Sequence, residues 1–197
     1  MRFLLGLTGS IGMGKTTTAQ MFRERGVPVW DADAAVHRMY AAGGAAVPLM
    51  QTLRPQAIVQ GAVDRTALKE WIAEDTNALA QIESVVHPLV AKDRAAWIAQ
   101  TDADILVVDV PLLFETGGET RVDAVAVVSA PADMQRARVL ARPNMTEAQF
   151  DAILAKQMPD AEKRARATYI IDSRTLDSAA ACVDDILTDI RRKLSNA

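Results

Sequence analysis

A glycine-rich segment near the start of the chain contains the residue types that bind the phosphates of a nucleotide. Gly9, Gly14, Lys15 and Thr16 fit the pattern G-x-x-x-x-G-K-[S/T]. In this pattern glycines let several backbone N–H groups point at phosphate oxygens, the lysine reaches the β- and γ-phosphates, and the hydroxyl can bind Mg²⁺. The spacing therefore predicts a site for a nucleoside triphosphate.

The residues around this segment supply the strand and the helix that a phosphate loop requires. A short apolar run, residues 3–8, precedes it, and residues 17–25 have helical character that ends at Gly26, a common C-terminal signal. The start of such a helix adds its dipole to an anion site. A glycine-rich turn that matched the pattern by chance would lack this setting, so we favour phosphate binding.

Two carboxylates follow the second candidate strand, residues 27–30. Asp31 and Asp33 come at the strand end, where open parallel sheets bind their ligands. A carboxylate there can orient the hydroxyl group that accepts a phosphoryl group and can take its proton. An Asp is equally common as the N-cap of a helix, here the helix through His37. The spacing leaves the two interpretations open.

A further acid, Asp109, follows the apolar run that begins at Ile105. In many phosphate-loop proteins an acid in this place holds water around Mg²⁺, so Asp109 is a candidate, together with Thr16, for a metal site. Any buried strand that ends in a capping Asp looks the same.

Basic side chains are frequent in residues 131–166, which read as helical. Arginines brought over the γ-phosphate stabilise the charge that spreads onto its oxygens during transfer. On a helix surface they would only be solvated. We expect one or two of the following set to be functional: Arg136, Arg138, Arg142, Lys156, Lys163, Arg164 and Arg166.

Apolar runs alternate with helical stretches, which is the pattern of an α/β fold with a parallel sheet covered on both faces. The candidate strands are residues 3–8, 27–30, 105–110, 122–128 and 169–172.

Two helical insertions separate these strands. Residues 34–101 are too many for one crossover and read as helices throughout, with Pro48, Pro55, Gly61 and Pro88 as punctuation. Residues 131–166 form the second, with helix starts at Pro131 and at Thr146, where a capping-box pattern begins. Residues 176–194 are expected to form a closing amphipathic helix.

The composition indicates a single domain with insertions. The chain has 197 residues, 50% of them hydrophobic, and a net charge of −3 with the basic residues scattered, so we expect no long nucleic acid as partner. Residues near the N-terminus lack the pattern of a signal peptide, and no later run is long enough to span a membrane. Cys182 is the single cysteine and is expected to be a buried thiol. We expect a cytoplasmic monomer with no membrane partner.

Several segments, in their order and spacing, resemble the dephospho-coenzyme A kinases over nearly the whole chain. The segments are residues 7–16, Asp31 and Asp33 with His37, Asp64 with Arg65, residues 87–89, residues 111–115, Arg138 with Arg142, residues 156–158 and residues 169–172.

The resemblance implies a three-layer phosphate-loop kinase core of residues 1–33, 102–130 and 167–197. It implies a coenzyme-A-binding helical insertion of residues 34–101 and a lid of residues 131–166. The implied reaction transfers the γ-phosphoryl group of ATP, with Mg²⁺, to the ribose 3′-hydroxyl of dephospho-coenzyme A.

The resemblance also implies roles for individual residues. Asp33 becomes the base, Lys15 and Arg142 act on the transferred phosphate, and Arg138 is a second lid arginine on the phosphates. The residues that would bind ATP are Gly9, Gly12, Met13, Gly14, Lys15, Thr16 and Thr17, and those on the acceptor side are Arg65, His87 and the loop around Leu113.

The chain departs from the family pattern at a few positions. Ser10 and Met13 stand where Gly and a small residue are usual, Pro143 follows Arg142, and Ser173 replaces a frequent Asn near the expected adenine pocket. These changes leave the base contacts and the role of Arg142 open.

Other functions fit part of the pattern. Another small-molecule or nucleoside monophosphate kinase could use the same scaffold, because a fold does not fix the acceptor. A regulatory GTPase would need an Asn-Lys-x-Asp signature, which we do not find. A module that binds ATP without catalysis is the third alternative.

Overall fold

The computed structural model describes residues 2–196 and separates into two compact units. The first, called here the sheet unit, contains the chain up to Trp30 and from Asp102 onward. The second, called the helical unit, contains Asp31–Thr101. Among residues 2–196 no helix has the length and apolar character needed to cross a bilayer.

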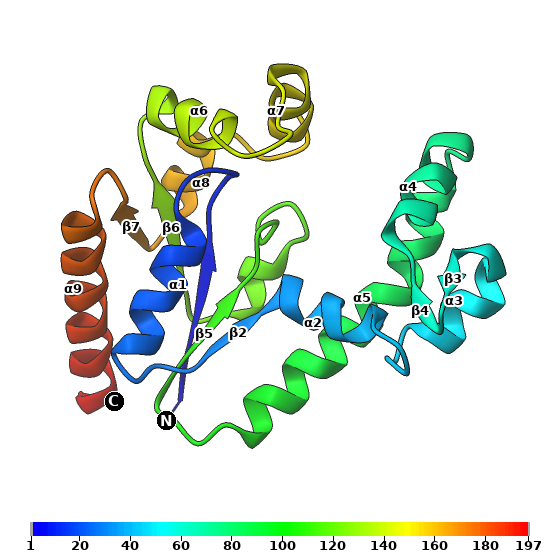
Figure 1. Ribbon diagram of the computed structural model, residues 1–197. Coiled ribbons are helices and arrows are strands. Elements are labelled where there is room, and N and C mark those ends of the chain that lie inside the picture. Colours follow the sequence, from blue (N-terminus) through cyan, green and yellow to red (C-terminus); the bar gives the residue numbers. More distant parts are fainter. Residues whose placement is uncertain (1, 197) are drawn as a thin grey trace. The chain divides into compact units, whose positions relative to one another are not determined.

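The sheet unit is built on a five-stranded sheet with the order β2-β5-β1-β6-β7 (Figure 1). The strands β1 and β5 pair in parallel, as do β1 and β6, and β6 and β7. The strands are β1 (Phe3–Thr8), β2 (Val29–Asp31), β5 (Ile105–Asp109), β6 (Ala124–Ser129) and β7 (Tyr169–Asp172). The predicted α/β class is confirmed, and the strands match the predicted runs within two residues.

The central strands are mostly apolar and are buried on both faces. Every residue of β5 and β6 is buried. Leu5 and Leu7 of β1 pack with Phe22 of α1 (Lys15–Glu24) and Val183 of α9 (Leu176–Ser195), and Figure 1 shows these two helices on one side of the sheet. A second cluster of buried residues contains Leu113, Phe114, Val125 and Val127.

The predicted lid contains three helices, α6 (Ala132–Leu140), α7 (Glu147–Leu154) and α8 (Asp160–Arg166). The capping box predicted at the start of α7 is present, since Thr146 and Gln149 each bond the other's backbone N–H. Arg136 of α6 joins α7 through an ion pair of 2.7 Å with Glu147, and its guanidinium lies over the Phe150 ring.

The helical unit is not helical throughout, so that prediction is wrong for residues 58–63. A two-stranded antiparallel hairpin, β3 (Ile58–Val59) and β4 (Ala62–Val63), follows the 3₁₀ turn η1 (Pro55–Ala57). Gln60 and Gly61 both have positive φ, 51° and 77°, as a two-residue hairpin turn requires. The helices are α2 (Ala32–Tyr40), α3 (Val47–Leu53), α4 (Arg65–Glu74) and α5 (Ala78–Gln100).

Pro88 was predicted to interrupt a helix, and this prediction is also wrong. The helix α5 continues through Pro88 for twelve more residues to Gln100. Proline removes the N–H that would bond the Ser84 carbonyl. Both Ser84 and Pro88 are exposed, so water can bond that carbonyl and the helix can continue.

Candidate active site

The phosphate loop joins β1 to α1, and several of its carbonyl groups accept hydrogen bonds. The Ser10 carbonyl accepts the N–H of Met13 at 3.2 Å. The Gly14 carbonyl accepts both the N–H and the hydroxyl of Thr18, each at 3.1 Å. The loop itself therefore satisfies two of its acceptors.

Two side chains from elsewhere in the sheet unit bond further carbonyls of the loop. Gln135 of α6 donates through Nε2 to the Ile11 carbonyl at 2.7 Å. Ser173, directly after β7, donates its hydroxyl to the Met13 carbonyl at 2.6 Å. These bonds fix the orientation of the peptide groups that contain the Ile11 and Met13 carbonyls.

Within residues 12–17 of the loop, five N–H groups have no hydrogen-bond partner in residues 2–196. They belong to Gly12, Gly14, Lys15, Thr16 and Thr17. The last three open the first turn of α1, where the helix dipole carries its positive end. Open N–H groups beside a positive dipole form an anion site, as the sequence predicted for a phosphate.

Lys15 and Asp109 form an ion pair at this site. The side chain of Asp109 is 3% exposed and that of Lys15 is 16% exposed. Their contact was not predicted from the sequence, where the two residues lie 94 positions apart. Because β1 and β5 are neighbours in parallel register, residues at their carboxyl ends meet. The pair offers a positive charge to a phosphate while a buried carboxylate holds the ammonium in place.

The glycines of the loop are required by close neighbours. A Cβ atom on Gly12 would lie 2.4 Å from Cγ2 of Val139, which is fully buried on α6. A Cβ atom on Gly9 would lie 2.7 Å from the carbonyl oxygen of Val128. The side chain of Met13 is also buried, and its sulfur accepts the N–H of Ala130 at 3.1 Å. The Met13 N–H and carbonyl are bonded as well, to the Ser10 carbonyl and the Ser173 hydroxyl, so Met13 shapes the loop.

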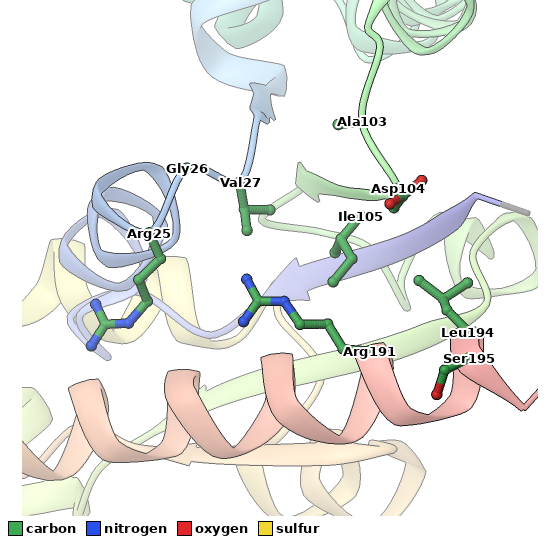
Figure 2. Close-up of a pocket in the computed structure, with 9 residues that line it drawn as sticks. All are labelled: Arg25, Gly26, Val27, Ala103, Asp104, Ile105, Arg191, Leu194 and Ser195. Atoms are coloured by element: carbon green, nitrogen blue, oxygen red, sulfur yellow. The ribbon is translucent and has the colours of Figure 1, made fainter.

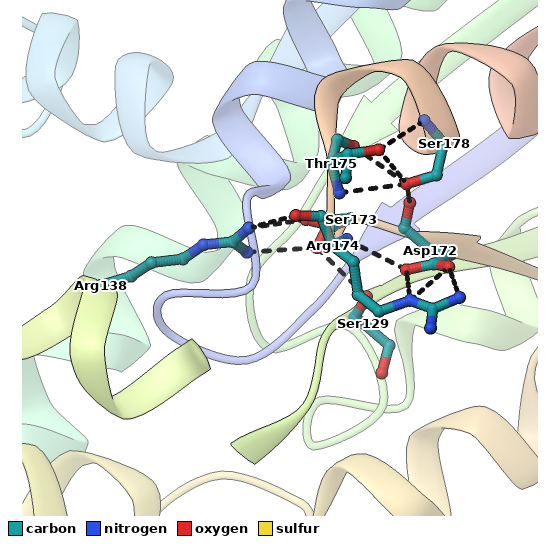
Figure 3. A network of polar contacts seen from close by, with 7 residues as sticks. All are labelled: Ser129, Arg138, Asp172, Ser173, Arg174, Thr175 and Ser178. Carbon is teal, nitrogen blue, oxygen red and sulfur yellow. Dashed lines mark hydrogen bonds and ion pairs between the residues drawn. The ribbon is translucent and has the colours of Figure 1, made fainter. Parts of the chain in front are cut away.

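Arg138 of α6 contacts the turn between β7 and α9 (Figure 3). Its guanidinium donates to the Ser173 carbonyl at 2.7 Å and to the Arg174 carbonyl at 3.4 Å. Arg174 itself pairs with Asp172, and the bonds from this arginine lower the pKa of that carboxyl. Arg138 is thus held beside Ser173, which also bonds the phosphate loop.

Two other basic residues of the predicted lid, Lys163 and Arg142, differ in their surroundings. Lys163 is fully buried and pairs with Glu115 at 2.9 Å, so it has a packing role that the sequence did not suggest. Burial would raise the pKa of Glu115, but the bonds from Lys163 and from the Met158 N–H outweigh it and lower that pKa. Arg142, beyond the end of α6, is exposed and able to contact a ligand.

The structure separates the roles of the two acids at the start of α2. Asp31 is the N-cap, since its Oδ1 accepts the N–H of Ala34 at 2.9 Å. Asp33 lies in the first turn, is exposed, and its carboxylate has no hydrogen bond within the described part of the chain. The capping interpretation is therefore confirmed for Asp31, and the role of Asp33 as a base stays a prediction.

Three residues were expected on the acceptor side. Arg65 begins α4, with its guanidinium 5.8 Å from the centre of the Tyr40 ring. Burial raises the pKa of Tyr40, and Arg65 partly opposes that rise. His87 is exposed on α5. Leu113 is fully buried, so its side chain belongs to the core, whereas its neighbour Leu112 is 40% exposed.

A pocket of about 440 Å³ lies at the other end of the sheet (Figure 2). It contains Ile105, the first residue of β5, whereas the phosphate site lies beside Asp109, the last. None of the predicted site residues contributes to its lining, which consists of Arg25, Gly26, Val27, Ala103, Asp104, Ile105, Arg191, Leu194 and Ser195.

The fold and this site define a phosphate-loop protein of the α/β kinase class. Within that class, the sequence model of the dephospho-CoA kinases matches residues 3–177, and the chain belongs to this family.

Individual relatives agree with this assignment. A dephospho-CoA kinase of Ruegeria pomeroyi is 61% identical over 191 residues, covering 97% of each chain. One of Cereibacter sphaeroides is 60% identical over 189 residues, covering 96% of each. A crystal structure of the protein TT1252 from Thermus thermophilus has a TM-score of 0.85 at 32% identity, covering 95% of this chain and 97% of that one.

Proposed function

We propose that the chain transfers the γ-phosphoryl group of ATP to the ribose 3′-hydroxyl of dephospho-coenzyme A, giving coenzyme A and ADP. The observation that carries the proposal is the phosphate loop with open N–H groups and the Lys15–Asp109 pair, in a chain of the dephospho-CoA kinase family. In phosphoryl transfer the protein mainly positions groups and neutralises charge, which suits such a loop.

We assign the nucleotide to the loop residues Gly9, Gly12, Met13, Gly14, Lys15, Thr16 and Thr17. Open N–H groups would bond the phosphates, and the Lys15 ammonium would compensate the charge on the β- and γ-phosphates. Arg138 and Arg142 would contact the phosphates from the lid, as guanidinium groups do when charge spreads over the transferred group.

We assign the proton transfer to Asp33. Its carboxylate takes the proton of the 3′-hydroxyl while that oxygen bonds the γ-phosphorus and the bond from phosphorus to the β–γ bridging oxygen breaks, releasing ADP. The assignment is supported by its exposure and by the capping role of Asp31, which leaves Asp33 without a structural task.

A Mg²⁺ ion fits the oxygen donors of the phosphate site. Within residues 2–196 no three His, Cys, Asp or Glu side chains gather to hold a metal, but Mg²⁺ beside a nucleotide keeps waters and uses few protein ligands. Thr16, with an exposed hydroxyl, and Asp109, directly or through water, would hold it. When bound, the ion neutralises phosphate charge.

We further propose that residues 34–101 bind the acceptor, with Arg65, His87 and the loop around Leu113 on that side, and that residues 131–166 act as a lid. A lid would exclude water, so that ATP is not simply hydrolysed. We also propose that the enzyme acts as a cytoplasmic monomer, with small molecules as its partners.

The direct test is to incubate the purified protein with ATP, Mg²⁺ and dephospho-coenzyme A and to identify the product by mass. The expected product gains one phosphoryl group at the 3′ position. Nucleoside monophosphates and shikimate, tested in parallel, address a different small-molecule kinase. Faster transfer to one of these acceptors, or ATP hydrolysis with no transfer, would overturn the proposal.

A further inference from the structure

The peptide groups on both sides of Ile11 are held by side-chain amides from the predicted lid. Gln135 of α6 donates through Nε2 to the Ile11 carbonyl at 2.7 Å. Gln157, in the turn between α7 and α8, accepts the Ile11 N–H on its Oε1 at 3.1 Å. A carbonyl can only accept and an N–H can only donate, so the chemistry of the partners fixes which way each amide points.

The bond from Gln135 also sets the direction of a donor in the phosphate loop. The Ile11 carbonyl and the Gly12 N–H belong to one planar trans peptide, in which the two groups point in opposite directions. Holding the carbonyl on α6 therefore turns the Gly12 N–H away from α6. This N–H is one of the five open donors of the loop.

The helix α6 also lies directly against this peptide. A Cβ atom on Gly12 would lie 3.0 Å from the Gln135 carbonyl oxygen, and Gln135 is only 6% exposed. A shift of α6 away from the loop would break the bond from Gln135. The orientation of the Gly12 N–H thus depends on the place of the predicted lid.

Gln157 has a second connection, through the next residue. The Met158 N–H donates to Oε1 of Glu115 at 2.8 Å, and Glu115 pairs with the buried Lys163. The turn that carries Gln157 is therefore fastened both to the phosphate loop and to the loop that follows β5.

We propose that Gln135 and Gln157 are positioning residues that couple the predicted lid to the phosphate loop. Together they form an amide latch on Ile11, which aims the Gly12 N–H at the nucleotide when the lid segments lie against the loop. They touch no reacting atom. The inference rests on the proposed function only in that the loop binds ATP.

The two glutamines have opposite hydrogen-bonding roles, which makes a sharp test possible. A carboxylate can accept the Ile11 N–H but cannot donate to the Ile11 carbonyl. Gln157→Glu should therefore keep its half of the latch, whereas Gln135→Glu should lose its half and place a charge against a carbonyl. Gln149→Glu is the matched control in the same segment, because Glu also completes a capping box.

The affinity for a non-hydrolysable ATP analogue with Mg²⁺ is measured by calorimetry, without an acceptor. We expect Gln135→Glu to weaken nucleotide binding about 10-fold or more, because the partly buried Ile11 carbonyl would be left without a hydrogen bond. Gln157→Glu and Gln149→Glu should stay within about threefold of the wild type. In acid the Gln135→Glu variant should regain affinity relative to the wild type, because burial raises the pKa of a carboxyl and a protonated carboxyl can donate.

Two results would contradict the latch, provided that the circular dichroism of the variants stays native. The first is an equal loss of nucleotide affinity in Gln135→Glu and Gln157→Glu, and the second is no recovery of affinity by Gln135→Glu at low pH. Either would show that only the shape of Gln135 matters. Gln135→Met, which keeps the length but cannot donate and adds no charge, should also lose affinity at pH 7.5, by no more than Gln135→Glu; wild-type affinity in this variant would equally overturn the latch. A wild-type protein that binds no nucleotide would refute the proposed function, whereas nucleotide binding without transfer to dephospho-coenzyme A leaves the latch test valid.

Discussion

The phosphate loop of the sheet unit and the first turn of α2 in the helical unit differ in how firmly their polar groups are held. In the loop, the carbonyls of Ile11 and Met13 are bonded by side chains and Lys15 is paired with a buried acid. In the first turn of α2, Asp33 is exposed, and its carboxylate has no bond within residues 2–196.

On the proposed assignment of the ATP site and the base, this difference means that the two halves of the reaction are prepared differently. Donors that are fixed before the nucleotide arrives need no reorganisation when it binds. A carboxylate on the surface has its position defined only once the acceptor hydroxyl bonds it, so its contribution should be seen in turnover more than in nucleotide affinity.

The largest effect is expected for Lys15→Ala. The change removes the ammonium from the phosphates and also leaves Asp109 without its ion-pair partner, so it should lower kcat/KM by about 10⁴-fold, combining lost affinity and lost stabilisation of the transition state. Steady-state kinetics and calorimetry with nucleotide measure the two parts. Lys69→Ala, an exposed lysine of α4, is the control. Intact ATP affinity in Lys15→Ala would contradict a prepared loop.

Asp33→Asn should lower kcat about 10²-fold or more with ATP affinity unchanged, because only proton transfer is lost. Asp31→Asn is its matched control, since Asn caps a helix as well as Asp and should change the free energy of unfolding by only a few tenths of a kcal/mol. If the two variants turn over at similar rates, the carboxylate of Asp33 has no catalytic part.

Ser173→Ala should have a smaller effect, confined to the nucleotide. It removes the hydroxyl that holds the Met13 carbonyl, and a single neutral hydrogen bond contributes about 1 kcal/mol, so KM for ATP should rise about fivefold with little change in kcat. Ser84→Ala removes an exposed hydroxyl that also bonds a backbone carbonyl, at 2.7 Å, and serves as control. A fall in kcat alone would argue against a role in holding the loop.

The smallest effect on turnover is expected for Glu115→Gln, which still accepts the Met158 N–H. Its effect should appear in stability and its pH dependence. The pKa of Glu115 is lower in the folded protein than in the unfolded chain. The carboxylate therefore stabilises the fold at pH values above about 4.3, the ordinary pKa of glutamate. This contribution is lost as the pH falls through the pKa of the folded state. Urea unfolding between pH 7 and pH 3 measures it. The variant should be about 3 kcal/mol less stable at pH 7, since Lys163 stays buried, and the difference should shrink in acid. A difference independent of pH would exclude the charge as its cause.

The sheet and the phosphate loop could be predicted because each depends on a local pattern. Short Val- and Ile-rich runs are typical of strands buried on both faces, and the spacing of Gly9, Gly14 and Lys15 is specific to one loop geometry. The hairpin at residues 58–63 was missed because two residues per strand are too few to show an alternating pattern. The prediction for Pro88 was wrong because a proline is tolerated inside a helix where the carbonyl four residues earlier is exposed to water. The local sequence does not show that exposure.

The contacts that hold the loop could not be predicted, because they join residues far apart in the chain. Gln135 and Ser173 are 124 and 160 residues from the loop carbonyls that they bond. A lone Gln or Ser carries no pattern that names its partner. Gln157 lies in one of the segments that resemble the family, which was the only indication that it matters.

The crowding at Gly12 has a consequence for how this chain can diverge. Gly12 and Gly26 both have a left-handed backbone, with φ of 78° and 75°, yet a Cβ atom on Gly26 would meet nothing within 4 Å. Asn, which tolerates that backbone, can therefore replace Gly26 during neutral drift. A side chain at position 12 would require a smaller residue in place of Val139 and a shift of α6. Gly12 and Val139, 127 residues apart in the chain, can therefore change only together.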